Sequence, residues 1–282
     1  GYLLSYSAFL RRYQDGTDAE DLRRRISPFL MRRLKKEVLT ELPDKIESVF
    51  TAQMSPEQAK VYEATMMRLR QRVDSIVKEK GFERGRTEVL AAITQLREIC
   101  CHPSLVLDDY TGTSGKLDML LDMLPEAIAK GRRVLLFSAF TSMLKILRRE
   151  LDDAGYETMY LDGDTPAQRR VEMAEQFNAG QGQIFLISLK AGGTGLNLTG
   201  ADMVIHYDPW WNPAAEDQAT DRAYRIGQTR KVEVIRLVTH ASIEEQVVAL
   251  GQRKKALFDQ LIKPGESMVG GLSPQEIMSL FQ

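Results

Sequence analysis

Apolar runs that alternate with amphipathic stretches dominate the second half of the chain. Between these runs, apolar residues recur at helical spacing, which predicts helices at residues 142–154 and from Pro166 onward, the second burying Val171, Ala174 and Phe177. Five runs have the length and apolar content of strands: residues 134–139, 158–161, 184–189, 203–207 and 232–238. Strands separated by helices favour a parallel sheet covered by helices on both faces, so the sequence predicts an α/β fold.

The first half of the chain carries a different, largely helical pattern. Residues 46–54 alternate loosely and predict a strand, after which Ser55 provides the capping residue of a helix that reaches about Lys80. A turn is expected at residues 81–85. The helix predicted at residues 87–101 has an apolar residue at every third position and therefore one buried stripe.

Composition and charge exclude several classes of protein. The 282 residues carry 38 Lys plus Arg against 39 Asp plus Glu, so nucleic-acid binding would depend on local patches. No apolar run reaches membrane-spanning length and residues 1–10 lack a secretory signal pattern, so we expect no membrane partner. The two cysteines are adjacent and the histidines number three, which excludes a disulfide framework and a histidine-built metal cluster. Basic residues crowd residues 22–37, where they could bind phosphates or form a solvated surface.

Ligands of such sheets bind at the carboxyl ends of the strands, so candidate chemistry is expected in the loops that follow them. After residue 189 the chain continues with Lys190 and then with three glycines in four positions, Gly192, Gly193 and Gly195. The backbone N–H groups of such a loop can approach a phosphate or a ribose, and Lys190 adds a positive charge. A glycine-rich turn can equally be a tight connection without a ligand.

Both tryptophans of the chain follow the strand at residues 203–207. Trp210 and Trp211 share one loop, and two neighbouring rings cannot easily both point inward. One ring could therefore stack on nucleic acid or wedge into a groove, although packing is the commoner role of tryptophan.

The helix that begins at Pro213 is expected to run to residue 226. Gln218, Arg222 and Arg225 are spaced i, i+4 and i+7, so they would share one helical face. Two arginines there could clamp a phosphate chain, whereas the alternative is an ordinary surface ion pair of Arg225 with Asp221.

Three other patterns look like familiar sites and fail. Gly115-Lys116 resembles the end of a phosphate-binding loop, but Leu117 replaces the Ser or Thr that would hold magnesium. Residues 105–109 mimic an acidic strand end, yet no phosphate loop precedes them, so we expect a plain turn. The Cys-Cys-His run at residues 100–102 cannot be a zinc site because adjacent ligands do not spread tetrahedrally. We expect no metal site within the chain.

Three longer segments carry a family resemblance. Residues 187–198 (ISLKAGGTGLNL), 208–213 (DPWWNP) and 218–228 (QATDRAYRIGQ) are similar to motif V, the aromatic loop and motif VI of the Swi/Snf-type ATPases of helicase superfamily 2. Shorter segments agree in the family's order: residues 28–35, 42–45, 96–103, 114–117, 134–138 and 242–245. The resemblance extends from about residue 22 to residue 262.

The resemblance implies a motor of two RecA-like lobes that binds ATP in the cleft between them and moves along double-stranded DNA. The first lobe would hold most of the ATP and Mg²⁺, and its phosphate loop is not found here, so the chain looks like the second lobe, inactive alone. Residues 1–45 would be the end of the first lobe or a connector. Residues 46–240 would form the second RecA-like lobe, with a helical insertion at about 55–110. Residues 241–282 would form C-terminal brace helices, at 242–262 and after Ser273.

The resemblance also implies roles for single residues. Arg222 and Arg225 match the arginine fingers that reach the ATP phosphates, and Gln218 matches the glutamine of the same motif. Positions near ATP are Gly193, Gly195 and Asn197. Positions that face DNA are Ser138, Ser188, Lys190 and Trp211. Tyr224 stands where many relatives carry histidine, which leaves its own role open.

The implied function is ATP-dependent remodelling of protein–DNA complexes by a translocase. Its partners would be double-stranded DNA, the first lobe and a DNA-bound protein complex. Two alternatives stay open: a strand-separating helicase, and a non-catalytic DNA- or protein-interaction module that keeps the fold. The location would be the cytoplasm, at the nucleoid, in a bacterium and the nucleus in a eukaryote.

Overall fold

A single parallel sheet forms the centre of the molecule. The structure is a computed structural model that describes residues 5–13, 19–26, 28, 42–191, 195–261 and 278–281. Within these residues, six parallel strands form one sheet in the order β1-β6-β5-β2-β4-β3. The strands are β1 (Lys45–Ala52), β2 (Val134–Ser138), β3 (Thr158–Leu161), β4 (Ile184–Ser188), β5 (Met203–His206) and β6 (Val232–Thr239). The predicted α/β fold with a parallel sheet is confirmed.

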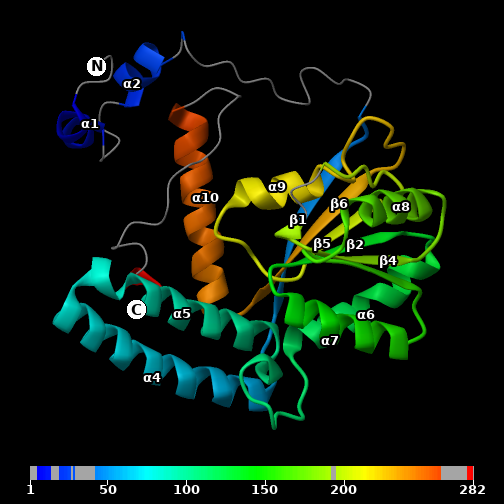
Figure 1. Cartoon of the computed structure of the whole chain (residues 1–282), viewed down its shortest axis with the longest axis horizontal. Coiled ribbons are helices and arrows are strands. Elements are labelled where there is room, and N and C mark those ends of the chain that lie inside the picture. Colours follow the sequence, from blue (N-terminus) through cyan, green and yellow to red (C-terminus); the bar gives the residue numbers. More distant parts are fainter. Residues whose placement is uncertain are drawn as a thin grey trace.

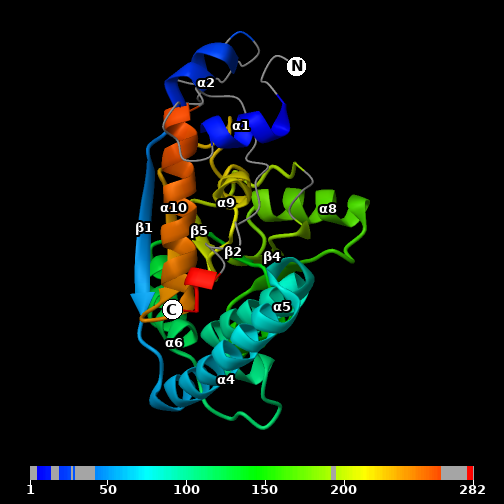
Figure 2. The same cartoon turned by 90° about the vertical axis from the view of Figure 1, so that its left-hand side faces the viewer.

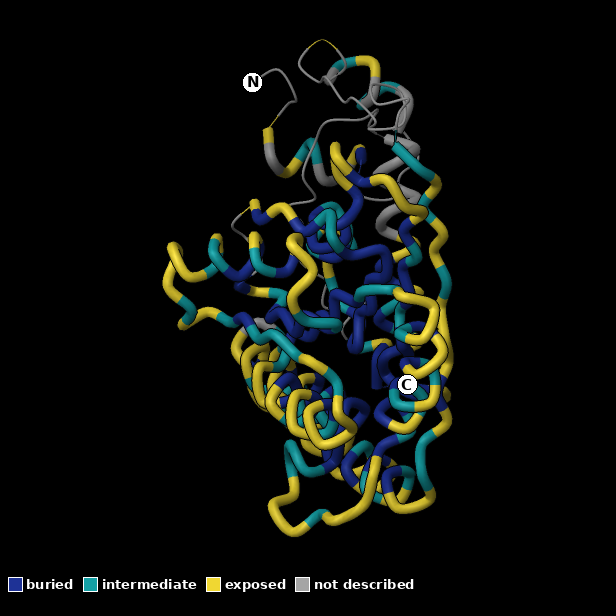
Figure 3. Tube along the Cα trace, turned by 90° about the vertical axis from the view of Figure 1, so that its right-hand side faces the viewer, coloured by how far each residue is buried: buried dark blue, intermediate teal, exposed yellow. Residues whose placement is uncertain are grey.

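Helices cover both faces of this sheet (Figure 1). Successive residues of a strand point to opposite faces, so Leu135 and Leu136 of β2 belong to different apolar clusters. The helices of one cluster are α6 (Gly115–Ala129) and α7 (Thr141–Asp153), and those of the other are α8 (Ala167–Asn178) and α9 (Pro213–Thr220). The inner strands are buried while the outer turns of the helices are exposed (Figure 3).

The buried face of α8 differs from the prediction at one position. Ala174 and Phe177 are buried as expected, but Val171 is 52% exposed and Met173 is buried in its place. At 100° per residue, Val171 lies roughly 110° around the helix from the centre of the face that Met173, Ala174 and Phe177 share. The spacing alone did not identify which residue completes that face.

A helical hairpin projects from the sheet and packs against the C-terminal helix (Figure 2). It consists of α4 (Pro56–Lys80) and α5 (Phe82–Cys101), and the helix it meets is α10 (Ile243–Leu261). Ser55 caps α4 by accepting a hydrogen bond from the Gln58 N–H at 3.1 Å, as predicted. The turn expected at residues 81–85 is wrong. Gly81 alone, at a φ of 74°, reverses the chain, so α5 begins at the next residue.

The ends of the chain are described only in part. Two short helices, α1 (Tyr6–Tyr13) and α2 (Ala19–Ile26), are joined through the Asp21 carboxylate, which accepts hydrogen bonds from Tyr13 and Arg25, each at 2.8 Å. Most of the basic run from residue 27 onward, and most of the short helix expected after Ser273, lie outside the described residues. Among the residues that are described, no helix combines the length and apolar content needed to cross a membrane.

Candidate functional site

The glycine loop after β4 and the segment after α9 lie side by side at the carboxyl edge of the sheet. The Arg225 guanidinium donates from Nη1 to the Gly195 carbonyl at 3.3 Å, and the Leu198 N–H donates to the Arg222 carbonyl at 3.0 Å. Two segments that are about thirty residues apart in sequence therefore lie next to each other. This is expected, because the carboxyl ends of parallel strands meet at one edge of the sheet. Gly193 lies outside the described residues.

Helix α9 is shorter than predicted, and this changes how its polar residues are presented. It ends at Thr220 and not at residue 226. The Arg222 carbonyl accepts from Leu198 and the Ala223 carbonyl from the Gln228 side chain at 3.1 Å, so these acceptors are bonded outside any continuing helix. Arg222 and Arg225 consequently stand on consecutive turns after the helix, and the expected single helical face is wrong.

The two arginines differ in their environment. Arg222 is only 4% exposed, and the pKa of its guanidinium is lowered to about 10, first because burial removes water and second because of the nearby positive charge of Arg225. Arg225 itself is exposed, as are Gln218 on α9 and Asn197 in the glycine loop. The two guanidiniums are therefore close enough for their positive charges to repel each other, and Arg225 is the one that is exposed.

Ser138 and Ser188 end two neighbouring strands but do not reach the surface. They are 1% and 2% exposed, and the Ser138 hydroxyl donates to the Asp208 carboxylate at 2.5 Å. Asp208 also accepts from the Ala139 N–H at 3.1 Å, so it ties the end of β2 to the loop after β5. The resemblance places both serines at positions that face DNA, and in this structure both are buried. Lys190, by contrast, is exposed.

Arg97, on α5, contacts the aromatic loop, and the sequence alone did not identify it as a candidate residue. From α5 it donates through Nη2 to Asp208 at 3.2 Å and to the Pro209 carbonyl at 2.7 Å. Its guanidinium carbon lies 5.4 Å from the ring centres of both Trp210 and Trp211, within range of cation–π attraction. Both tryptophans are half-buried, so neither stands free in solvent. The one feature of the sequence that could have indicated this role is the positive charge of Arg97 within a helix predicted to have a buried stripe.

The failed phosphate loop at residues 115–116 has a structural explanation. A Cβ at Gly115 would stand 1.7 Å from the Gln53 carbonyl, so a close backbone approach requires glycine there. Lys116 is 1% exposed and its Nζ bonds Glu244 at 2.6 Å and the Tyr207 carbonyl at 3.0 Å. This lysine is committed to joining α6 to α10. Within the described part of the chain, no cluster of three or more His, Cys, Asp or Glu side chains is placed to hold a metal ion.

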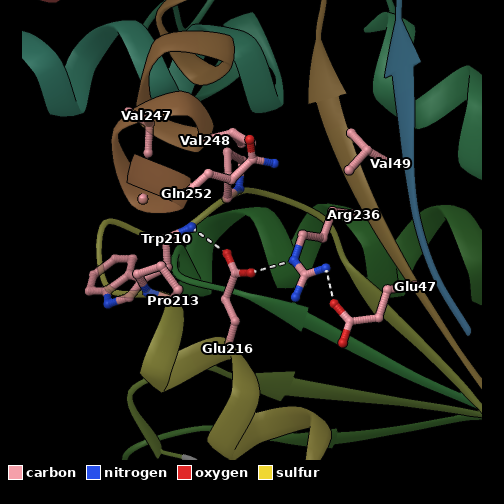
Figure 4. Close-up of a pocket in the computed structure, with 11 residues that line it drawn as sticks. Glu47, Val49, Trp210, Pro213, Glu216, Arg236, Val247, Val248 and Gln252 are labelled. Atoms are coloured by element: carbon pink, nitrogen blue, oxygen red, sulfur yellow. Dashed lines mark hydrogen bonds and ion pairs between the residues drawn. The ribbon is translucent and has the colours of Figure 1, made fainter. Parts of the chain in front are cut away.

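A cavity of about 240 Å³ lies between α9, α10 and the first strand of the sheet. Figure 4 shows its polar wall, in which Glu216 accepts from the Trp210 N–H and from Arg236, each at 2.7 Å, and Arg236 also bonds Glu47. Burial raises the pKa of Glu216 despite these bonds. The chain of ion pairs holds α9 on β6 and thereby fixes the start of the segment that carries Arg222.

Two family models match successive parts of the chain. The SNF2-related domain matches residues 6–105, and the helicase conserved C-terminal domain matches residues 115–227. The second match includes both the glycine loop and the two arginines.

Individual proteins give the same picture. The Bacillus subtilis protein named "Putative ATP-dependent helicase/translocase YwqA" is 38% identical over 100% of this chain and 32% of its own length. The Sulfolobus solfataricus SWI2/SNF2 ATPase core in complex with dsDNA is 34% identical, with a TM-score of 0.66 over 93% of this chain and 57% of that one. The C-terminal domain of the same ATPase is 29% identical, with a TM-score of 0.65 over 84% of this chain and 98% of that domain. The chain thus spans about a third of the curated relative and just over half of the ATPase core.

Proposed function

We propose, from the premise that this chain belongs to the SNF2 family of ATP-dependent helicases, that it acts as the second motor lobe of a double-stranded DNA translocase. The observation that carries the proposal is the contact of Arg225 with the glycine loop at Gly195, beside the buried Arg222. Phosphoryl transfer needs positive charge positioned at the phosphate chain more than it needs covalent chemistry from the protein.

The residues present fit the phosphates of ATP as a bound substrate. Arg225 offers an exposed guanidinium fork to a planar or tetrahedral anion, and Arg222 stands behind it as a second, more buried cation. Gly195 and Asn197 present exposed backbone beside them. Gln218 is exposed on α9, four residues before Arg222, and in this proposal it would orient polar groups at the same site.

The rest of the ATP site would come from a first RecA-like lobe. When bound there, Mg²⁺ would neutralise the phosphate charge. In this proposal Arg222 and Arg225 complete the pocket when the lobes close, and they withdraw when the lobes open. Lys190 and the loop of Trp211 would hold the DNA, mainly through phosphates, so binding should weaken as salt rises and should depend little on sequence.

The test compares ATP turnover by this chain alone with turnover by the complete protein, each with and without duplex DNA. We expect DNA-stimulated turnover only in the complete protein, because two arginines without a phosphate loop do not make an active site. DNA-stimulated hydrolysis by the purified chain, free of contaminating ATPase, would overturn the half-site proposal. Strand displacement by the complete protein would instead favour a strand-separating helicase.

A further inference from the structure

Strand β1 is an exposed edge of the sheet (Figure 2). It pairs with β6 on one side, and no other strand of the described residues pairs with its outer side. The Asp44 carbonyl accepts a hydrogen bond from the N–H of Val232 in β6 at 3.2 Å, and the Ala52 carbonyl accepts one from the N–H of His240, directly after β6, at 2.8 Å. Because backbone groups alternate in direction along a strand, the even-numbered residues of β1 bond β6. Lys45, Glu47, Val49 and Thr51 therefore direct their N–H and C=O groups outward.

Exposed apolar side chains lie along this edge, whereas edge strands usually have features that prevent pairing with another strand. Ile46 is 51% exposed, Val49 is 47% exposed and Phe50 is 37% exposed. Natural edges are commonly blocked by prolines, bulges or inward-pointing charges, because an open edge is a template for another strand. Strand β1 is eight residues long, Lys45–Ala52, and contains no proline that would block the pairing of another strand.

A groove or cavity accompanies the strand on each face of the sheet. On the α10 side, Glu47 and Val49 line the cavity of Figure 4 together with Val247. On the α6 side, Phe50 lines a groove whose other walls are Met119, Met123, Asp118 and Asp122. A strand added to β1 would send alternate side chains into these two spaces.

The two spaces differ in chemistry, which specifies the occupant. The space on the α10 side offers apolar surface from Val49 and Val247, and its acidic and basic groups are already joined in ion pairs. The groove on the α6 side presents the exposed carboxylates of Asp118 and Asp122 beside two methionines. Side chains with long apolar stems and a positive end match that groove.

We propose that β1 is a docking edge for an extended segment of a partner protein, in which apolar and basic side chains alternate and which adds to the sheet as a further strand. Its apolar side chains enter the cavity on the α10 side, and its lysine or arginine side chains lie along α6 at Asp118 and Asp122. Main-chain hydrogen bonds to Glu47, Val49 and Thr51 supply the common part of the affinity, and the alternate side chains supply selectivity. The proposal does not depend on the nucleotide site.

The test uses an eight-residue peptide with valine and lysine at alternate positions, added to the complete protein without ATP or DNA. Backbone amide exchange is then measured residue by residue. We expect the outward amides of Glu47, Val49 and Thr51 to exchange at least about tenfold more slowly, while Ser48 and Phe50, already bonded to β6, are unchanged. Equal protection of both sets, or of neither, would overturn the proposal.

Two control peptides and a pair of variants separate strand addition from general electrostatic attraction. A peptide of the same sequence with alternate backbone nitrogens methylated should not protect these amides, and a valine–glutamate peptide should bind more weakly. Asp122→Lys should weaken the valine–lysine peptide about five- to tenfold, whereas Asp153→Lys, an exposed carboxylate on α7, should leave affinity unchanged. Binding that ignores methylation, or a dimer joined through β1 in sedimentation, would overturn the proposal.

Discussion

Arg97 and Asp208 form an ion pair that is almost completely shielded from water, although 111 residues separate them in sequence. Their side chains are 3% and 0% exposed. Arg97 belongs to the helical hairpin and Asp208 to the aromatic loop, so this one contact joins the insertion to the carboxyl edge of the sheet. Arg97 also bonds the Pro209 carbonyl, so the hairpin contacts the loop of Trp210 and Trp211 directly.

Replacing Arg97 with methionine should destabilise the fold strongly. Asp208 would remain buried with its negative charge uncompensated, which typically costs about 3–5 kcal/mol in the free energy of unfolding. Urea denaturation followed by circular dichroism measures this change. Arg86→Met, at an exposed position on the same helix, should change stability by less than about 0.5 kcal/mol. Similar small losses for both variants would show that the buried ion pair does not stabilise the hairpin.

His206 should make stability depend on pH in a defined window. Burial, followed by the charge of Arg236, lowers the pKa of His206 to about 3 from its ordinary value near 6.5. The folded state therefore keeps the ring neutral while the unfolded state takes up a proton, so stability is complete above pH 6.5 and falls as pH drops toward 3. The slope from this group is at most about 1.4 kcal/mol per pH unit.

The measurement is the free energy of unfolding between pH 6.5 and pH 5, where few carboxylates titrate. His206→Gln should reduce the slope by about one proton, because the variant has no ring to protonate in the unfolded state. An unaltered slope in His206→Gln would contradict the buried neutral imidazole.

Trp211→Ala should uncouple movement from ATP hydrolysis in the complete protein. The ring packs on the cluster of α4, α5 and α10 and near Arg97, so its loss loosens the loop proposed to grip DNA. We expect fewer base pairs moved per ATP, measured by triplex displacement and phosphate release in parallel. Trp211→Phe keeps an aromatic face and should restore part of the coupling. Normal movement per ATP in the alanine variant would leave the tryptophan with a packing role alone.

The fold could be predicted because periodicity is a local property of the sequence. Residues 184–189 are apolar except for Ser188, and they predict the bounds of the buried strand β4 to within one residue. The end of α9 could not be predicted in this way. The Arg222 carbonyl, which a longer helix would use, is bonded by the Leu198 N–H from the distant glycine loop, and the Ala223 carbonyl by the Gln228 side chain.

In the candidate site, too, features set by neighbouring residues could be predicted, whereas features set by distant residues could not. Lys190 was found in the loop after a predicted strand and Arg225 by its spacing on a predicted helix, and both are exposed. The serines at the ends of β2 and β4 looked equally available, but burial depends on packing that neighbouring residues do not report. Arg97 could not be identified from its neighbours because its partner, Asp208, lies 111 residues away in a loop.

The central claim is that Arg225, with Arg222, completes an ATP site shared with another lobe. The most direct measurement is DNA-stimulated ATP turnover by the complete protein carrying Arg225→Ala, with folding checked by circular dichroism. Arg230→Ala is the matched control, since Arg230 is exposed and pairs with Asp202 at 3.5 Å, away from Gly195. We predict that Arg225→Ala lowers turnover about a thousandfold or more while Arg230→Ala keeps it. Turnover by folded Arg225→Ala within about twofold of the unaltered protein would contradict the account.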